Sequence, residues 1–239
     1  MTVTGAEAMV KCLEAEGINL VFGYPGVAIA PFYEGLYNSG IEHVLVRQEQ
    51  NAGHAAAAFG RIENRPGVCI ATSGPGALNL ITALATAYMD SIPLIAITGQ
   101  VPTDQLGRDV FQEADITGAA EPFTKHSFLV KDVTDIPRIM KEAFYIASTG
   151  RPGPVLIDLP MDMQTAEFEP VWPETVSIRG YNPSSRPNPL QIKRVREAIA
   201  AARRPVIVAG GGVFAAGAQQ ELLCWAEQTG IPVVTTMMG

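Results

Sequence analysis

The sequence has few cysteines and histidines, and their spacing gives no sign of a metal site or a disulfide framework. Only three of its 239 residues are cysteines, at positions 12, 69 and 224, and three are histidines. Disulfide scaffolds and zinc sites use closely spaced cysteines, whereas an odd number of distant ones is typical of reduced thiols in a core. We therefore expect Cys12, Cys69 and Cys224 to be reduced and buried, and no residue to bind a metal.

Clustered charge and long apolar runs are also missing. Charged residues make up 17% of the chain, the net charge is −7, and no run of like charges occurs. Nucleic acids and acidic membrane surfaces attract clustered basic residues, so neither is an expected partner. No segment reaches the roughly 18 apolar residues of a membrane span, and no basic leader precedes an apolar block at the N-terminus. We expect a cytoplasmic protein.

What the sequence does contain is an alternation of short apolar runs and amphipathic segments. The apolar runs, rich in β-branched and aliphatic residues, are 18–22, 43–47, 67–72, 93–98, 126–130 and 154–159. Segments with helical periodicity are 4–16, 30–38, 51–63, 77–89 and 135–149. Continuous apolar strands separated by helices predict an α/β fold, with a doubly wound, mostly parallel six-stranded sheet and helices on both faces.

The pattern changes after residue 166. Residues 167–188 are rich in proline and polar residues and lack apolar periodicity, which is typical of a domain linker. Beyond them, a helix at 189–202, a strand at 204–210, a helix at 217–229 and a strand at 231–236 predict a second α/β domain. Two strands are too few for a sheet with its own core. We expect residues 1–166 to form one domain and 189–239 to be the incomplete start of another.

The carboxyl ends of the predicted strands carry the residues best suited to binding a ligand. Turns of glycine and proline at 23–26 and 73–76 follow the first and third strands, and Glu49 follows the second. Ligands of open parallel sheets bind at these strand ends, and glycine lets the backbone approach a flat ligand closely. The fourth strand leads into a long polar segment, 98–118, which holds Phe111 and Gln112 and is long enough to indicate a function.

The residues alone leave two interpretations of Glu49. A carboxylate at a helix N-terminus is stabilised by the helix dipole by about 0.3–1 kcal/mol, and Glu49 could be only such a solvated group. Alternatively, the alanine-rich helix that follows packs closely and holds Glu49 in a dry crevice, where it becomes neutral and shares a proton with a ligand nitrogen. The turn at 73–76 matches neither G-x-G-x-x-G nor a P-loop, which disfavours both of those sites.

The ordered set of motifs resembles the N-terminal, pyrimidine-binding domain of thiamine diphosphate (ThDP)-dependent decarboxylases and carboligases, in particular the acetolactate synthase type. These motifs are FGYPG, RQEQNAGHAA, TSGPGALN, FQEADI, TKHSFLV and RPGPVLIDLP. The resemblance covers about residues 4–165 and continues through RRPVIVAGGGV into the central domain of that family. Because the family places its ThDP-activating glutamate at the position of Glu49, the resemblance favours the second interpretation.

The resemblance implies a role for each of these residues. Glu49 is the implied catalytic residue: it hydrogen-bonds N1′ of the aminopyrimidine, so that the imino tautomer can remove the C2 proton. The implied ThDP-binding residues are Glu49, Tyr24, Pro25, Gly26, Thr72, Pro75, Asn79 and Gln112. Those implied to face the substrate are Val27, Phe111, Gln112 and Met161. Those implied to contact a structural FAD are Arg151, Gly210, Gly211 and Gly212. Mg²⁺, which holds the diphosphate, would have its ligands on a C-terminal domain outside these 239 residues.

The resemblance also implies an assembly and a reaction. A homodimer or homotetramer with shared active sites is expected, and a regulatory small subunit is a further candidate partner. The implied reaction is decarboxylation of pyruvate and condensation with a second 2-oxo acid, in branched-chain amino acid biosynthesis. Val27, Gln48 and Met161 depart from the glycine, histidine and lysine common in the family. These departures leave ThDP use intact and bear on the substrate, so another 2-oxo acid or acyl donor stays open.

Three alternatives stay beside this interpretation. Another ThDP-dependent 2-oxo acid or acyl-CoA decarboxylase, or an acetyltransferase, would use the same chemistry. A nucleotide-binding flavoprotein module would explain the glycines at 210–212, but no G-x-G-x-x-G follows the first strand. A non-catalytic ThDP-binding protein would need no glutamate at position 49. The 239-residue chain alone is expected to fold and associate but to be inactive, because the diphosphate half of the site would lie elsewhere.

Overall fold

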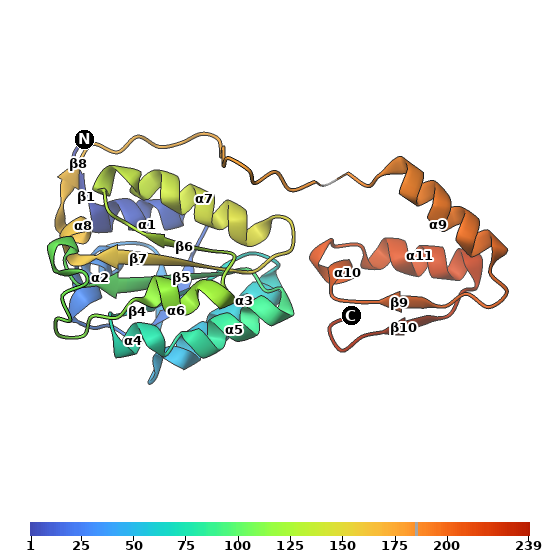
Figure 1. Cartoon of the computed structure of the whole chain (residues 1–239), viewed down its shortest axis with the longest axis horizontal. Helices are drawn as coiled ribbons and strands as arrows, with labels where there is room; N and C mark the ends of the chain where they lie inside the picture. Colours follow the sequence, from blue (N-terminus) through green and yellow to red (C-terminus); the bar gives the residue numbers. More distant parts are fainter. Residues whose placement is uncertain (185) are drawn as a thin grey trace. The chain divides into compact units, whose positions relative to one another are not determined.

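The chain folds into two units, Met1–Tyr181 and Asn182–Gly239, in a computed structural model that describes residues 1–184 and 186–239 (Figure 1). Their boundary falls inside the segment predicted as a linker. Residues 167–181 belong to the first unit, because β8 (Glu167–Phe168) pairs with β1 (Val3–Thr4) in an antiparallel ribbon. The hydroxyl of Tyr181 also donates a hydrogen bond of 2.9 Å to the carbonyl of Thr149.

The first unit is built on the predicted sheet, in the strand order β3-β2-β4-β5-β7-β6. The strands are β2 (Leu20–Gly23), β3 (Glu42–Leu45), β4 (Gly67–Ala71), β5 (Leu94–Gln100), β6 (His126–Leu129) and β7 (Pro154–Pro160). All neighbours are parallel, which confirms the predicted six-stranded parallel sheet. Strands β4, β5 and β7 are buried along their whole length, so their sequences are continuously apolar.

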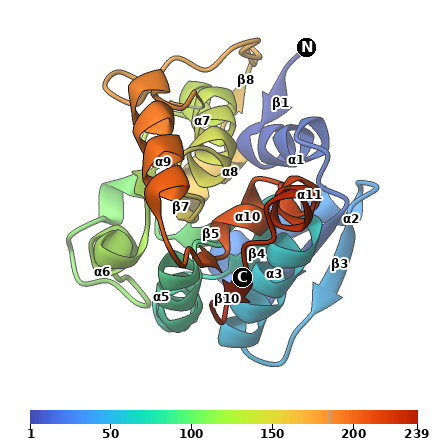
Figure 2. The same ribbon diagram turned by 90° about the vertical axis from the view of Figure 1, so that its right-hand side faces the viewer.

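Helices cover both faces of this sheet, as predicted (Figures 1 and 2). One face carries α1 (Gly5–Ala15), α2 (Ala30–Tyr37) and α7 (Ile136–Ser148). The other carries α3 (Glu49–Glu63), α4 (Pro75–Leu78), α5 (Ile81–Asp90) and α6 (Ile116–Ala120). The segment 77–89, predicted as one helix, is split between α4 and α5, with an interruption at residues 79–80. In the described ranges, 1–184 and 186–239, no helix is long and apolar enough to cross a membrane.

The second unit has the predicted order of elements with one short helix added. It consists of α9 (Pro189–Ala201), β9 (Ile207–Ala209), α10 (Gly212–Ala215), α11 (Gln219–Thr229) and β10 (Val233–Thr235). Its two strands are parallel neighbours, with Ile207 opposite Val233. Gly210 and Gly211 link β9 to α10, and Gly212 is the first residue of α10.

The cysteines are placed as predicted in the first unit but not in the second. Cys12 and Cys69 are buried, and burial raises the pKa of both thiols to about 12, so both are protonated at neutral pH. The expectation that Cys224 is buried is wrong. Cys224 lies on α11, none of whose eleven residues is buried, so its side chain is exposed.

Helices α3 and α5 pack so closely that residue 53 must lack a side chain. A Cβ atom at Gly53 would lie 2.4 Å from the Cβ of Ala83. An alanine in place of glycine usually stabilises a helix by about 0.5–1 kcal/mol. Here we expect Gly53→Ala to lower the free energy of unfolding by about 1–3 kcal/mol, because the two helices must move apart. Urea denaturation of the chain measures this change.

Gly40→Ala is the matched control, because a Cβ atom at Gly40 would have no atom within 4 Å. This substitution should change the free energy of unfolding by less than about 0.5 kcal/mol. Equal stability of the Gly53→Ala chain and the parent would mean that α3 and α5 separate without cost.

Candidate active site

Glu49 is the first residue of α3 and lies close to the end of β3. The helix starts there because the backbone of Gln48 is extended (φ −158°, ψ 140°). The side-chain amide of Asn79, at the end of α4, donates a hydrogen bond of 2.8 Å to Oε2 of Glu49. These two residues are 30 positions apart in the sequence. Their contact joins the connection after β3 to the connection after β4.

Two glycines allow the strand-end turns to approach this carboxylate. A Cβ atom at Gly76 would lie 3.2 Å from Oε1 of Glu49 and 2.8 Å from Cγ2 of Thr72. A Cβ atom at Gly26 would lie 2.5 Å from the Cβ of Thr72. Any larger residue at 26 or 76 would have to displace Thr72 or Glu49. The turns at 23–26 and 73–76 therefore form one continuous surface with Glu49.

Thr72 lies in the middle of this surface with its hydroxyl unused. The Oγ1 atom is buried and has no hydrogen-bond partner among the residues that the structure describes. An unpaired buried polar group costs about 1–3 kcal/mol. Between the two glycines, the site thus holds a hydrogen-bonding group that a ligand could satisfy.

The turn at 73–76 also contacts the long loop after β5. Gly74 has φ +57°, which favours glycine, and a Cβ atom there would lie 2.5 Å from the carbonyl oxygen of Gln112. Gln112 itself has φ +57°. The structure therefore brings Gln112 to the same edge of the sheet as Glu49. Phe111 beside it is 86% exposed.

The remaining residues predicted to bind ThDP or substrate are mostly on the surface of this edge. Tyr24, Pro25 and Pro75 are exposed, and Val27 is 79% exposed. Met161 is partly buried at the start of α8 (Met161–Thr165), which follows β7. Exposed apolar side chains gathered beside polar groups are typical of a surface that binds a ligand or another chain.

Arg151, one of the residues predicted to contact FAD, is not at this edge. Arg151 precedes β7 and so lies at the amino ends of the strands, opposite Glu49. Its guanidinium donates hydrogen bonds to the hydroxyl of Ser91 (2.7 Å) and the carbonyl of Met89 (3.0 Å), at the end of α5. Gly210, Gly211 and Gly212 belong to the second unit.

Sequence analysis missed a buried polar cluster next to the site. It consists of Thr98 and Gln100 on β5 and Asp158 on β7, which are 0%, 2% and 1% exposed. Thr98 Oγ1 donates a hydrogen bond of 2.7 Å to Asp158 Oδ1, and Gln100 Nε2 donates one of 2.9 Å to Oδ2. The signal in the sequence was a carboxylate inside the apolar run 154–159, where a buried strand normally has none.

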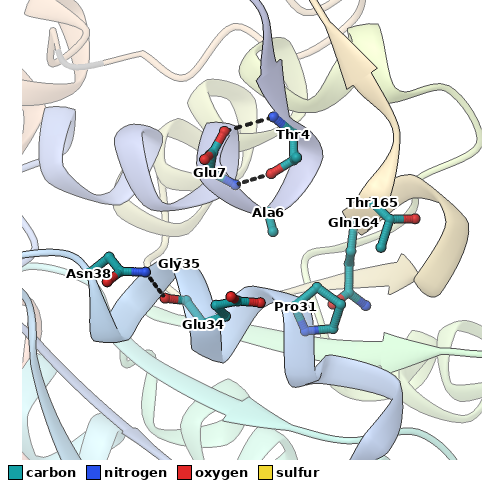
Figure 3. Close-up of a pocket in the computed structure, with 9 residues that line it drawn as sticks. All are labelled: Thr4, Ala6, Glu7, Pro31, Glu34, Gly35, Asn38, Gln164 and Thr165. Atoms are coloured by element: carbon teal, nitrogen blue, oxygen red, sulfur yellow. Dashed lines mark hydrogen bonds between the residues drawn. The ribbon is translucent and has the colours of Figure 1, made fainter.

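A cavity of about 280 Å³ lies between α1, α2 and α8 (Figure 3). Its lining residues come from the first turn of α1, from α2 and from α8, and are Thr4, Ala6, Glu7, Pro31, Glu34, Gly35, Asn38, Gln164 and Thr165. Figure 3 shows Thr4 and Glu7 bonded to each other in a capping box, and Asn38 bonded to the carbonyl of Glu34. These polar groups serve the helix ends, and the cavity includes no residue predicted for the site.

Among residues 1–184 and 186–239, no group of three or more His, Cys, Asp or Glu side chains is placed to hold a metal ion.

Two models of protein families match the chain. "Thiamine pyrophosphate enzyme, N-terminal TPP binding domain" matches residues 3–119, and "Thiamine pyrophosphate enzyme, central domain" matches residues 192–239. Thiamine pyrophosphate (TPP) is another name for ThDP. The first match includes Glu49 and the turns around it, and the second includes the glycines at 210–212.

Several curated proteins are similar to the chain along nearly its whole length. It is 53% identical to the acetolactate synthase large subunit of Corynebacterium glutamicum over 99% of the chain and 38% of that protein. It is 51% identical to the acetolactate synthase of Mycobacterium bovis, again over 99% and 38%. It is 49% identical to the acetolactate synthase isozyme 3 large subunit of Escherichia coli, over 99% of the chain and 42% of that protein. The chain thus spans about two fifths of the length of these relatives.

Asp158 should make the stability of the chain depend on pH. Burial raises the pKa of this carboxyl group from 3.8 to about 7, and the hydrogen bonds from Thr98 and Gln100 oppose the rise. Below pH 3.8 both folded and unfolded chains hold the proton, and the stabilising contribution is fully present. Between pH 3.8 and 7 the unfolded chain loses the proton first, so stability falls by about 1.4 kcal/mol per pH unit.

Urea denaturation at pH 5 and pH 8 of the parent and of Asp158→Asn, which cannot titrate at this position, measures the effect. We expect the parent to lose about 2–3 kcal/mol relative to Asp158→Asn between these pH values. Parallel pH dependence of the two chains would mean that Asp158 titrates near its ordinary value.

Proposed function

The chain belongs to the thiamine pyrophosphate enzyme family, and we propose that it supplies the pyrimidine-binding half of the active site of an acetolactate synthase. The observation that carries this proposal is the position of Glu49. It starts α3 within the matched TPP-binding domain, bonds to Asn79 and contacts the glycine turn of the next strand. The names of the similar proteins support the reaction, although the chain spans only two fifths of them.

The residues at this edge fit the aminopyrimidine ring of ThDP. The ring is flat, and Gly26 and Gly76 leave a surface that one added Cβ atom would fill. It carries hydrogen-bonding edges, and the buried Thr72 hydroxyl lacks a partner among the described residues. Oε2 of Glu49 is bonded to Asn79, while Oε1 faces Gly76 and accepts no hydrogen bond from the described part of the chain. That oxygen is free to bind N1′.

The proposed mechanism divides the work among these side chains. When bound, ThDP supplies a thiazolium carbon that becomes a nucleophile, with the amino group of its own pyrimidine as the base. Glu49 would hold a proton at N1′, and Asn79 would fix the orientation of the Glu49 carboxyl group. Thr72 and the backbone of the turn at 23–26 would orient the ring. Tyr24 and Pro75 would shield it from water.

We also propose the substrate and the assembly. Val27, Phe111, Gln112 and Met161 would face a pyruvate-derived group and a second 2-oxo acid. The exposed apolar side chains at the edge support a second copy of the chain completing the site, in a homodimer or homotetramer. Two of the similar proteins are named large subunits, which supports a regulatory small subunit as a further partner.

Mg²⁺ and FAD are the two further groups that we propose. Mg²⁺ would be bound outside this chain, together with the diphosphate. FAD would contact Arg151, Gly210, Gly211 and Gly212, as the resemblance implies. The guanidinium of Arg151 is already hydrogen-bonded to Ser91 and Met89. A flavin would have to replace or share these hydrogen bonds.

A different acyl donor is the second candidate. Val27 and Met161 provide an apolar surface where a glycine and a charged lysine are common in the family. Analysis of the products formed from pyruvate by the complete enzyme distinguishes acetolactate synthesis from decarboxylation or acetyl transfer.

Glu49→Gln should slow removal of the C2 proton of bound ThDP by about 10²–10⁴-fold, because a glutamine cannot share a proton with N1′. Hydrogen–deuterium exchange at C2, measured in the complete enzyme with ThDP and Mg²⁺, reports this step directly. The control is Glu63→Gln, the same chemical change on the exposed last residue of α3. If C2 exchange in Glu49→Gln proceeds at the parent rate, Glu49 is only a carboxylate stabilised by the dipole of α3.

A further inference from the structure

The side chain of Gln100 hydrogen-bonds both ends of the long loop after β5. Its Oε1 accepts a hydrogen bond of 2.9 Å from the backbone N–H of Val101, where the loop starts. Its Nε2 donates one of 2.9 Å to the carbonyl of Ala114, where the loop ends. One amide therefore holds together the two ends of a loop of fourteen residues, 101–114.

Asp158 completes the hydrogen bonding of this amide. The second hydrogen on Nε2 of Gln100 goes to Oδ2 of Asp158, at 2.9 Å, inside the sheet. The other oxygen of Asp158 accepts from Thr98, which is its direct neighbour in the register of β5 and β7. Without the Asp158 oxygen, a buried N–H of Gln100 would have no partner, and such groups are strongly disfavoured. The amide would then turn away from the loop to find one.

Two further carboxylates hold the rest of the loop. Asp162 at the start of α8 accepts hydrogen bonds from the backbone N–H (3.1 Å) and the hydroxyl of Thr103. Glu113 accepts from the backbone N–H groups of Gly107 and Val110. Gln112 lies two residues before Ala114, to whose carbonyl Gln100 is bonded.

We propose that Asp158 is a positioning residue: through Gln100 it fixes the loop that carries Phe111 and Gln112 against the Glu49 site. The part of this inference that concerns substrate rests on the proposed function. The part that concerns the loop does not, because it depends only on contacts within the chain.

Three substitutions separate this role from a general contribution to stability. Asp158→Ala removes the oxygen that Gln100 needs. Asp158→Asn keeps an oxygen for Gln100, while its NH₂ can donate to the Thr98 hydroxyl, so it should rescue the loop. Thr98→Val removes an equally buried hydrogen bond from the same carboxylate but leaves Gln100 bonded, so it is the matched control.

Amide hydrogen exchange of the 239-residue chain is the first measurement. Asp158→Ala should exchange at least about tenfold faster than the parent in peptides from 101–114, with α7 unchanged. Asp158→Asn and Thr98→Val should stay within about twofold of the parent. Parent-like loop exchange in Asp158→Ala, or equal acceleration in Thr98→Val, would overturn the proposal. If Asp158→Ala does not fold, Gln100→Met, which keeps Asp158 and Thr98 together, must give the same loop-specific acceleration.

Kinetics of the complete enzyme form the second measurement. Asp158→Ala should raise the KM for the 2-oxo acid about tenfold while C2 exchange of bound ThDP stays at the parent rate, because the loop and not Glu49 has moved. Rescue of KM by Asp158→Asn supports the positioning role. An unchanged KM with a loosened loop overturns the link to substrate. Failure of the proposed function would appear separately, as parent-like C2 exchange in Glu49→Gln.

Discussion

The parallel direction of the strands is the constraint on which the site depends. Strands β4, β5 and β7 lie side by side, with Ala71 opposite Thr98 and Thr98 opposite Asp158, so their carboxyl ends meet at one edge. The chain leaves each strand at that edge and must return to the other edge through a helix or a loop before the next parallel strand begins. The residues at these turns come from distant parts of the sequence but are neighbours in space. A site made of short motifs far apart in the chain is the direct result.

Close packing at this edge costs stability, and glycine keeps the cost tolerable. Gly26, Gly74 and Gly76 each allow an approach that a Cβ atom would prevent. Two costs remain. The hydroxyl of Thr72 is buried without a partner among the described residues, and Gln112 adopts a left-handed backbone conformation. Unpaired buried groups and strained backbone usually gather where a ligand or a partner compensates for them. Both destabilising features, at Thr72 and at Gln112, lie at the candidate site, where a bound ligand could compensate for them.

The sheet was predictable from the sequence because burial on both faces makes parallel strands continuously apolar. The interruption of the helix predicted at 77–89 was not, because Asn79 and Leu80 do not break helical periodicity. Asn79 ends α4 where its side chain reaches Glu49. Cys224 was wrongly expected to be buried because residue type alone does not say what covers α11. The candidate roles of Glu49 and Gln112 came from resemblance to a family, since position at a strand end leaves both bland and catalytic interpretations open.

The two acids at this edge illustrate why burial alone does not identify a catalytic group. Asp158 is the more buried, and burial raises its pKa, yet both of its oxygens are occupied by Thr98 and Gln100 within the sheet. Glu49 is only partly buried, but one of its oxygens accepts no bond from the described part of the chain and faces Gly76. Proton exchange with a ligand requires contact with that ligand. A carboxylate enclosed by its own protein can position a loop, whereas only one at an open edge can hold a proton for a bound ring.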